Sequence, residues 1–561
     1  MRDKLVLIIA LSALIWACTE PSDPTAEPAR AQFSGSFSGA LIRADVRALS
    51  ADDMQGRATG TPGEARAADW IESRFREIGL QPVNGSYRQS VRLVGMRRED
   101  GISTLSITGA SGALPLQDGI NVAFWSTAQE PVVQIDAPLL FVGYGVEAPE
   151  YGWDDFKGTD VSGKVLLFLN NDPPASEAGG ELFGGEARTY YGRWTYKFEQ
   201  AMKHGAAGAL MVHTTPSASY PFSVVQRSGS RESFALDLPG AGYQVPVVGW
   251  LDENLSTEIA AAMGTDLEGL FEMASAREFA PLDTGYQVTG TITTNVRRMS
   301  TQNVLGLLPG SDPQLADQVI VFSAHYDHLG YDASLEGPDK TFNGAWDNAT
   351  GVAAISALAD AFATGEAPRR SLLFLACAAE ESGSLGSAWF VAEPPFALNR
   401  LVANFNIDMP QIFGVTSDLA AIGVDTSTLG AILREVAGEF TVALDGRDVP
   451  IRVTGDPNPS AGSFYRSDQV NFAKAGIPAL FMNPGSDFVD ELSFDPAEYE
   501  AAHYHQVTDE VTDEWDLSGM VRDLEIIMAT VRRVDANDEL PRWNAGNEFE
   551  TAWRALHGIQ E

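Results

Sequence analysis

Three short runs of nearly unbroken hydrophobic residues occur in the second half of the chain, at 318–324, 371–377 and 401–407. Runs of this length without alternation are typical of strands that are buried on both faces of a parallel sheet. A residue with a metal-binding side chain follows each run within a few positions: His325, the pair Glu380 and Glu381, and Asp408. Because ligands bind at the carboxyl ends of strands in open α/β sheets, we expect these side chains to share one crevice.

Two further residues extend this set. Asp347 precedes the small-residue segment 348–362, which predicts a helix, and we expect Asp347 to cap its N-terminus while its carboxylate points back over the sheet edge. His505 lies in one of the two segments that hold four of the seven histidines, namely His325, His328, His503 and His505. Singly, each residue has an ordinary surface or capping role as the alternative. Together they form the ligand set of two zinc ions that share one carboxylate, with Glu380 left over as a base.

At this point the chain resembles the co-catalytic zinc aminopeptidases of metallopeptidase family twenty-eight. The resemblance rests on short motifs in a specific order: AHYDHLG at 324–330, NGAWDNATG at 343–351, AEESGSLGS at 379–387, NID at 406–408, YRSD at 465–468 and YHQ at 504–506. The stretch DMQGRATGTPGE at 53–64 looks like the usual N-terminal stretch of the family.

The resemblance implies a role for each candidate residue. Asp347 would bridge two zinc ions, with His325 and Asp408 completing one site. Glu381 and His505 would complete the other site, and Glu380 would be the general base of catalysis.

Four more residues receive roles with less direct support. Asp327 lies two residues after His325, so on a strand it would face the same way and orient the imidazole. The resemblance implies that the hydroxyl of Tyr504 stabilises the oxyanion, that Arg466 contacts substrate and that Asp468 supports the ligands from behind. Departures from the common family pattern at 382–384, at Gln469 and at Pro410 remove neither a ligand nor the base, and concern the specificity pocket.

The fold class that we predict is α/β, with a mixed, mostly parallel sheet flanked by helices and an inserted β-rich domain. The zinc peptidase domain would comprise 37–136 and 263–540, followed by a C-terminal tail at 541–561. Residues 137–262, with hydrophobic strands and a helix-glycine-strand unit, resemble a protease-associated (PA) domain. Because both ends of this insert enter the peptidase fold, we expect it to sit over or beside the metal crevice.

The N-terminus predicts export. Basic residues precede a hydrophobic run too short to span a bilayer, so 1–17 reads as a signal peptide, and Cys18 reads as the lipidated cysteine of a periplasmic or cell-surface lipoprotein. An ordinary signal peptide is the alternative. Residues 18–36 would form a flexible tether. Cys377, the other of two cysteines, falls in a predicted core strand and receives no catalytic role.

Composition limits the partners. A formal net charge of −38 argues against nucleic acid and against an anionic membrane surface, so contact with a membrane is expected only through the lipid anchor. The function that the sequence favours is an aminopeptidase with two zinc ions acting on peptides. The alternatives are a carboxypeptidase of the same family, a non-catalytic binding protein on the same fold, and a cyclotransferase that uses one zinc ion. The intact ligand set and base weaken the last two.

Overall fold

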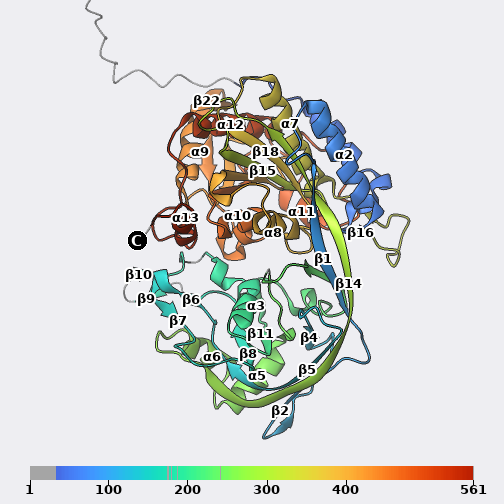
Figure 1. The fold of residues 1–561 in the computed structure, drawn as a ribbon, viewed down its shortest axis with the longest axis vertical. Helices are drawn as coiled ribbons and strands as arrows, with labels where there is room; N and C mark the ends of the chain where they lie inside the picture. Colours follow the sequence, from blue (N-terminus) through green and yellow to red (C-terminus); the bar gives the residue numbers. More distant parts are fainter. Residues whose placement is uncertain (1–32, 174–175, 178–179, 186, 241, 560–561) are drawn as a thin grey trace, which may run out of the picture.

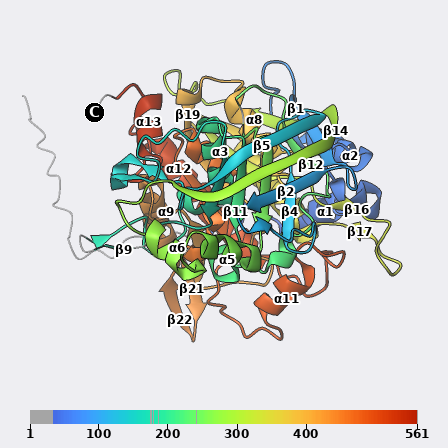
Figure 2. The same ribbon diagram turned by 90° about the horizontal axis from the view of Figure 1, so that it is seen from below.

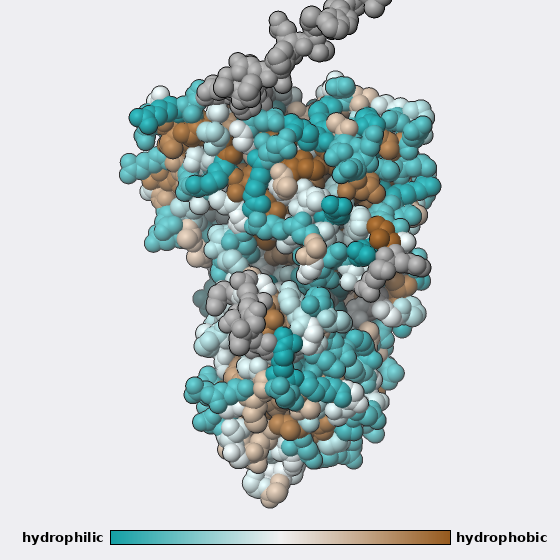
Figure 3. Space-filling model, turned by 90° about the vertical axis from the view of Figure 1, so that its left-hand side faces the viewer, coloured by the Kyte–Doolittle hydropathy of each residue, from teal (hydrophilic) through white to brown (hydrophobic). Residues whose placement is uncertain are grey.

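The computed structural model describes residues 33–173, 176–177, 180–185, 187–240 and 242–559. The predicted signal peptide, Cys18 and the tether up to residue 32 lie outside the described residues. Within the described ranges, no helix is long and apolar enough to cross a membrane. Figure 1 shows two lobes one above the other, joined on one side by the long strands β1 (Arg88–Arg98) and β14 (Leu282–Leu308). Figure 3 shows the lower lobe as the narrower of the two.

The upper lobe is built on the predicted hydrophobic strands. β15 (Val319–His325), β18 (Ser371–Cys377), β19 (Leu401–Ile407) and β24 (Ala479–Asn483) run parallel to their neighbours in the order β24-β19-β15-β18. β20 (Asp418–Ile422) and β14 flank them as antiparallel neighbours, and β23 (Arg452–Thr454) forms the edge beside β20. The prediction of a mixed, mostly parallel sheet in an α/β fold is confirmed.

Helices cover both faces of this sheet, which explains why its strands are hydrophobic without alternation. Ile320 and Phe322 face one core, whereas Val319 and Val321 on the same strand face another. The larger core packs the sheet against α1 (Gly39–Leu49), α2 (Pro62–Ile78), α7 (Thr350–Thr364), α9 (Thr428–Glu439) and α12 (Ser518–Ala536). On the opposite face lie α8 (Leu385–Ala392) and α10 (Gln469–Lys474), which contribute Phe390 and Phe472.

The lower lobe has its own sheet and core. Its strands follow the order β5 (Val132–Phe141), β8 (Val165–Leu169), β11 (Gly208–Val212), β13 (Val247–Leu251) and β4 (Val122–Trp125), with α3 (Trp194–Lys203), α5 (Glu253–Ala262) and α6 (Leu267–Ala274) beside them. The core of this lobe runs from Ile107 to Ile292, beyond the range 137–262 assigned to the insert from the sequence. The physical reason is that β14 and α6 supply one side of that core.

The strand β14 belongs to both lobes. Its first half pairs with β5 and with β2 (Thr104–Gly109), and its second half pairs with β1 and β18. Figure 2, seen from below, shows β5 and β14 running side by side across the molecule. The two lobes therefore share one continuous sheet, which fixes the lower lobe on the β1 and β14 side.

Shorter elements complete the fold. Residues at the C-terminus pack rather than trail: Trp543 and Phe549, ahead of α13 (Glu550–Leu556), are buried against Phe464. The remaining helices and strand pairs are α4 (Thr215–Ala218), α11 (Pro496–His503), β3 (Gly112–Ala113), β6 (Glu147–Ala148) with β7 (Trp153–Asp154), β9 (Ser176–Glu177) with β10 (Gly180–Glu181), β12 (Ser233–Leu236) on β1, β16 (Gly330–Tyr331) with β17 (Thr341–Phe342), and β21 (Thr441–Leu444) with β22 (Arg447–Pro450).

Candidate metal centre

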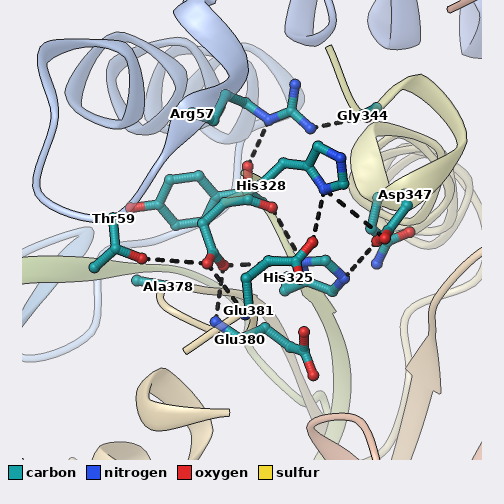
Figure 4. A network of polar contacts seen from close by, with 12 residues as sticks. Arg57, Thr59, His325, His328, Gly344, Asp347, Ala378, Glu380 and Glu381 are labelled. Atoms are coloured by element: carbon teal, nitrogen blue, oxygen red, sulfur yellow. Dashed lines mark hydrogen bonds and ion pairs between the residues drawn. The ribbon is translucent and has the colours of Figure 1, made fainter. Parts of the chain in front are cut away.

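The carboxyl ends of three neighbouring parallel strands meet at one place, as the sequence predicted. His325 is the last residue of β15, Asp408 directly follows β19, and Glu380 and Glu381 follow β18. Figure 4 shows His325, Glu381 and Asp347 turned toward one another from separate segments. Asp347 comes from the turn ahead of α7, and His505 from the segment after α11. All five side chains predicted as ligands are brought together.

Two groups of donor atoms share the carboxylate of Asp347. In the first group, His325 Nε2 lies 3.1 Å from Asp347 Oδ1 and 3.3 Å from Asp408 Oδ1. In the second, His505 Nε2 lies 3.1 Å from Asp347 Oδ2 and 3.2 Å from Glu381 Oε2. Within each group the candidate ligand atoms all lie within 4.8 Å of one another. The two oxygens of Asp347 therefore face two different groups, which is the geometry of a bridging carboxylate.

Asp347 reaches this position by a route that the sequence did not predict. α7 begins only at Thr350, after an irregular turn over Ala345–Ala349, so Asp347 does not cap the helix. The cap-like bond comes from Asn348, whose Oδ1 accepts the Gly351 N–H at 2.9 Å. The carboxylate of Asp347 is thereby left free to face the histidines, and the prediction that it caps α7 is wrong.

A buried carboxylate holds the backbone of that turn. Asp509 accepts hydrogen bonds from the backbone N–H groups of Trp346, at 2.8 Å, and Asp347, at 3.0 Å. Gly344, with φ 54°, opens the turn, and a Cβ there would lie 2.6 Å from the ring of His328. Only glycine combines this left-handed conformation with so close an approach. Neither contact was predicted from the sequence.

Asp327 supports the centre mainly through the backbone of the glutamate pair. β15 ends at His325, so the strand alternation behind the sequence prediction does not extend to Asp327. Its carboxylate accepts the N–H of Glu380 at 2.9 Å and of Glu381 at 3.3 Å. The His325 Nδ1 atom lies 3.2 Å from the Asp327 carbonyl oxygen and 3.8 Å from the carboxylate, so the carbonyl is the nearer partner of the ring.

Glu380 belongs to neither donor group, although the charges of members of both groups, His325, Asp408 and Glu381, act on its carboxyl group. The Ser384 hydroxyl donates a hydrogen bond to its Oε1 atom at 3.2 Å. Burial raises the pKa of Glu380 well above its ordinary value, and the charges of Glu381 and Asp408 act in the same direction. A carboxyl group with a raised pKa next to a metal centre has the properties of a general base and acid.

His328 is a site residue to which the sequence interpretation gave no role. Its Nδ1 atom lies 2.7 Å from Glu381 Oε1, it belongs to the same donor group as His505, and its Nε2 atom is buried without a hydrogen-bond partner. The sequence feature that could have identified His328 is its position three residues after His325 in the same motif. His328 either joins the ligands or orients Glu381, whose other oxygen faces His505.

The remaining predicted residues lie in different surroundings. Tyr504 is 43% exposed and its ring stacks on His505 with 4.0 Å between centroids, so this side of the centre is open. Asp468 is buried, and its carboxylate accepts a hydrogen bond from Ser387 at 2.5 Å. Ser467, which was not predicted, donates to Asp408 Oδ2 at 2.8 Å. Arg466 is exposed on the turn just before Ser467.

The donor chemistry fits zinc. Imidazole nitrogens and carboxylate oxygens are the usual ligands of Zn²⁺ with N and O donors. In the metal-free protein the same groups pair as ions. Burial would lower the pKa of His505, but hydrogen bonds with Asp347 and Glu381 raise it to about 10. Burial and Asp347 would raise the pKa of Glu381, but hydrogen bonds with His328 and His505 lower it to about 2.

These pKa shifts predict that zinc binding releases protons. His505 is protonated in the metal-free protein at pH 7 because its pKa is raised, whereas a histidine that binds zinc must be neutral. Isothermal titration calorimetry at pH 7, in buffers with different ionisation enthalpies, should give heats that vary linearly with those enthalpies, in the direction of proton release. Release should decrease as the pH approaches 10. Identical heats in all buffers would contradict the protonated cluster.

Comparison with known proteins finds similar sequences and folds. A probable glutamate carboxypeptidase from Zea mays is 25% identical over 414 residues, covering 70% of this chain and 53% of the relative, so the chain spans about half the length of that relative. Among solved structures, an aminopeptidase from Aneurinibacillus sp. strain AM-1 is 18% identical and covers 91% of this chain and 96% of its own, with a TM-score of 0.49. A zinc aminopeptidase from Bacillus subtilis is 18% identical with coverages of 89% and 95% and a TM-score of 0.41.

The family model that matches is that of peptidase family M28, over residues 303–530. This segment contains both donor groups and Glu380. The comparison therefore identifies residues 303–530, which hold the candidate metal centre, as a segment of the peptidase family M28 type.

Proposed function

We propose that the protein is a zinc-dependent aminopeptidase that removes residues from the N-termini of peptides. The observation that carries the proposal is the position of Asp347 between two donor groups, with Glu380 next to both and a member of neither. Such an arrangement suits two zinc ions and a separate proton acceptor. The match of residues 303–530 to the model of peptidase family M28 agrees with it.

The ligand assignment follows the two donor groups. We propose that Asp347 bridges the ions, that His325 and Asp408 complete one site, and that Glu381 and His505 complete the other. His328 then holds Glu381 through its Oε1 atom, while Oε2 faces the second site. Two bound zinc ions would polarise the scissile carbonyl and lower the pKa of a water molecule to about 7.

Glu380 would carry the proton. It accepts a proton from the attacking water as the oxygen adds to the carbonyl carbon, and it donates that proton to the departing amine as the C–N bond breaks. Water is thereby added across the peptide bond and Glu380 returns to its starting state. The Tyr504 hydroxyl, at the open edge, would donate a hydrogen bond to the carbonyl oxygen as it gains negative charge.

The lower lobe contacts the upper lobe in two further places, which supports a role in restricting access. Leu236 and Phe234 of β12 belong to the same hydrophobic cluster as Ala379, the residue before Glu380. On another side, the Arg188 N–H donates to the Pro459 carbonyl at 3.0 Å. We propose that this lobe is a lid over the crevice, and the resemblance of its sequence to a PA domain stays a prediction.

A second set of contacts closes the lobes together opposite the shared strands. Lys474 of the upper lobe donates to the Tyr190 hydroxyl at 2.7 Å and to Glu199 at 2.8 Å in the lower lobe. The Tyr190 backbone N–H donates to the half-buried Glu548 at 3.2 Å, and Glu548 also accepts a hydrogen bond from Tyr465. We refer to these five residues as the interlobe seam.

Carboxypeptidase activity is the second candidate function. The observation in its favour is the 25% identity with the plant protein named a probable glutamate carboxypeptidase. Both activities use the same zinc chemistry, so the end of the peptide that is recognised distinguishes them. The many acidic side chains around the centre would repel a strongly acidic substrate, which favours the aminopeptidase.

Export as a lipoprotein through Cys18 also remains part of the proposal, on the N-terminal sequence alone.

Substrates with one blocked end test the proposed function. A short peptide with a free N-terminus and an amidated C-terminus should be hydrolysed, and the matched peptide with an acetylated N-terminus and a free C-terminus should not. Product masses determined over time identify the residue that is released. Hydrolysis of the acetylated peptide from its C-terminus, with the amidated peptide left intact, would replace the aminopeptidase by the carboxypeptidase.

Replacement of the proposed base tests the mechanism. Glu380→Gln preserves the size of the side chain and removes the proton acceptor, so kcat should fall at least about 100-fold while zinc content stays near that of the parent protein. Glu381→Gln is the matched control, since it should lower zinc content. If instead Glu380→Gln loses zinc and Glu381→Gln keeps it, the roles of the two glutamates are reversed.

Loosening the interlobe seam tests the lid. Lys474→Met removes the two hydrogen bonds to Tyr190 and Glu199, so the lobes should open more readily and KM for longer peptides should change relative to KM for a dipeptide. Lys340→Met is the control, because Lys340 bonds only a carbonyl of its own exposed loop in the described structure. Unchanged kinetics for every peptide length in the Lys474 variant would argue against the lid.

A further inference from the structure

The N-terminal stretch 53–64 has no part in the proposed mechanism, yet one of its side chains lies under the metal centre. Arg57 is completely buried and donates hydrogen bonds to four backbone carbonyls. Figure 4 shows the bond to Gly344. The Nε atom of Arg57 bonds Tyr326 at 2.6 Å, Nη1 bonds Leu49 at 2.8 Å and Asn343 at 2.6 Å, and Nη2 bonds Gly344 at 2.8 Å. A planar guanidinium with five N–H donors in a fixed fork is suited to such a set of acceptors.

The carbonyls that Arg57 binds belong to the segments that present the ligands. Tyr326 directly follows His325, and Asn343 and Gly344 open the turn that carries Asp347. The backbone of Arg57 also takes part, because its carbonyl accepts the N–H of His328 at 3.4 Å. One side chain thus joins the loop after β15 to the turn before α7, and these two segments supply ligands from both donor groups.

The rest of the stretch is packed against the same loops. The Thr59 hydroxyl donates to the Asp327 carboxylate at 3.3 Å, and that carboxylate holds the backbone of Glu380 and Glu381. Gly56 lies so close to β16 and β17 that a Cβ would come within 2.4 Å of the Gly330 carbonyl oxygen. The contacts of Gly56 and Thr59 therefore fix the backbone on both sides of Arg57, which a residue that positions other groups requires.

The charge of Arg57 also acts on the centre. Burial lowers the pKa of Arg57 to about 10, against the attraction of Asp509, Asp327 and Asp347, so the group remains charged at neutral pH. A fixed positive charge beside a cation site weakens the binding of the cation by electrostatics alone. The four hydrogen bonds to the backbone that bears the ligands can offset this electrostatic cost of placing Arg57 under a zinc centre.

We propose that Arg57 is a positioning residue of the metal centre, whose guanidinium fixes the two backbone segments that present His325 and Asp347 to zinc. The inference rests on the proposed function only in that the centre binds zinc, and it does not depend on which peptide is hydrolysed. It differs from a general contribution to folding and from a purely electrostatic effect, and each of the three gives its own pattern of zinc affinities.

Two substitutions separate these patterns. Arg57→Lys keeps the charge but replaces the fork by an ammonium group with three donors, and Arg57→Gln removes the charge. Zinc affinity is measured on the folded full-length protein by competition with a chromogenic chelator, and thermal unfolding is followed in parallel by circular dichroism. If Arg57 positions the ligands, both variants should bind zinc at least about 10-fold more weakly than the parent protein.

A matched control is Arg370→Lys. Arg370 is equally buried in the same lobe and donates to the carbonyls of Val534 and Asp535, away from the donor groups. This variant should unfold at a lower temperature while its zinc affinity stays unchanged.

Three results would overturn the inference. Tighter zinc binding by Arg57→Gln with normal binding by Arg57→Lys would show that only the charge matters. Normal zinc affinity in both variants, with a lowered unfolding temperature as in the control, would make Arg57 a stability residue. Failure of Arg57→Lys to fold would likewise make Arg57 a stability residue. If the variants lose zinc affinity as expected while the parent protein binds zinc and hydrolyses no peptide, the inference stands and the proposed function falls.

Discussion

Seven carboxylate side chains lie in one crevice of the upper lobe, and the structure around them compensates for their mutual repulsion. Burial makes each unpaired negative charge in this crevice costly. The carboxylates around the ends of the parallel strands are those of Asp327, Asp347, Glu380, Glu381, Asp408, Asp468 and Asp509. Three kinds of group stabilise these charges: histidines between the carboxylates, backbone N–H groups that donate to Asp327 and Asp509, and the positive charge of Arg57. Two divalent cations would replace the protons of the histidines that bind them and add positive charge to the crevice, so metal binding should also stabilise it.

The fold meets this constraint by separating rigid support from the open face. His325 and Asp408 stand at the ends of strands buried between two helical layers, where packing leaves little freedom to move. His505 and Tyr504 come from a less buried segment at the open edge, where substrate would enter. The lower lobe shares β14 with this scaffold and meets it again at the interlobe seam. The proposed lid and the strands that present the ligands are thus parts of one continuous sheet.

The sequence predicted the parts of this arrangement that follow from local pattern. The strands ending near His325, Glu381 and Asp408 were evident because burial on both faces leaves an unbroken hydrophobic run, and the mostly parallel sheet follows from them. The turn that frees Asp347 from helix capping was not predictable, since it depends on Asp509, which is distant in sequence. His328 and Arg57 were missed as site residues for the same reason: their partners are Glu381 and four carbonyls from other segments. The extent of the lower lobe was underestimated because β14 serves two cores.

We propose that one carboxylate, that of Asp347, belongs to both zinc sites. The zinc content of purified Asp347→Asn and Asp408→Asn variants, determined by elemental analysis beside the parent protein, tests this most directly. We expect two zinc ions per chain in the parent protein, loss of both ions in Asp347→Asn, and loss of no more than one in Asp408→Asn, because Asp408 lies in a single donor group. Retention of one tightly bound ion in Asp347→Asn would show that the sites do not share this residue, and would contradict the account.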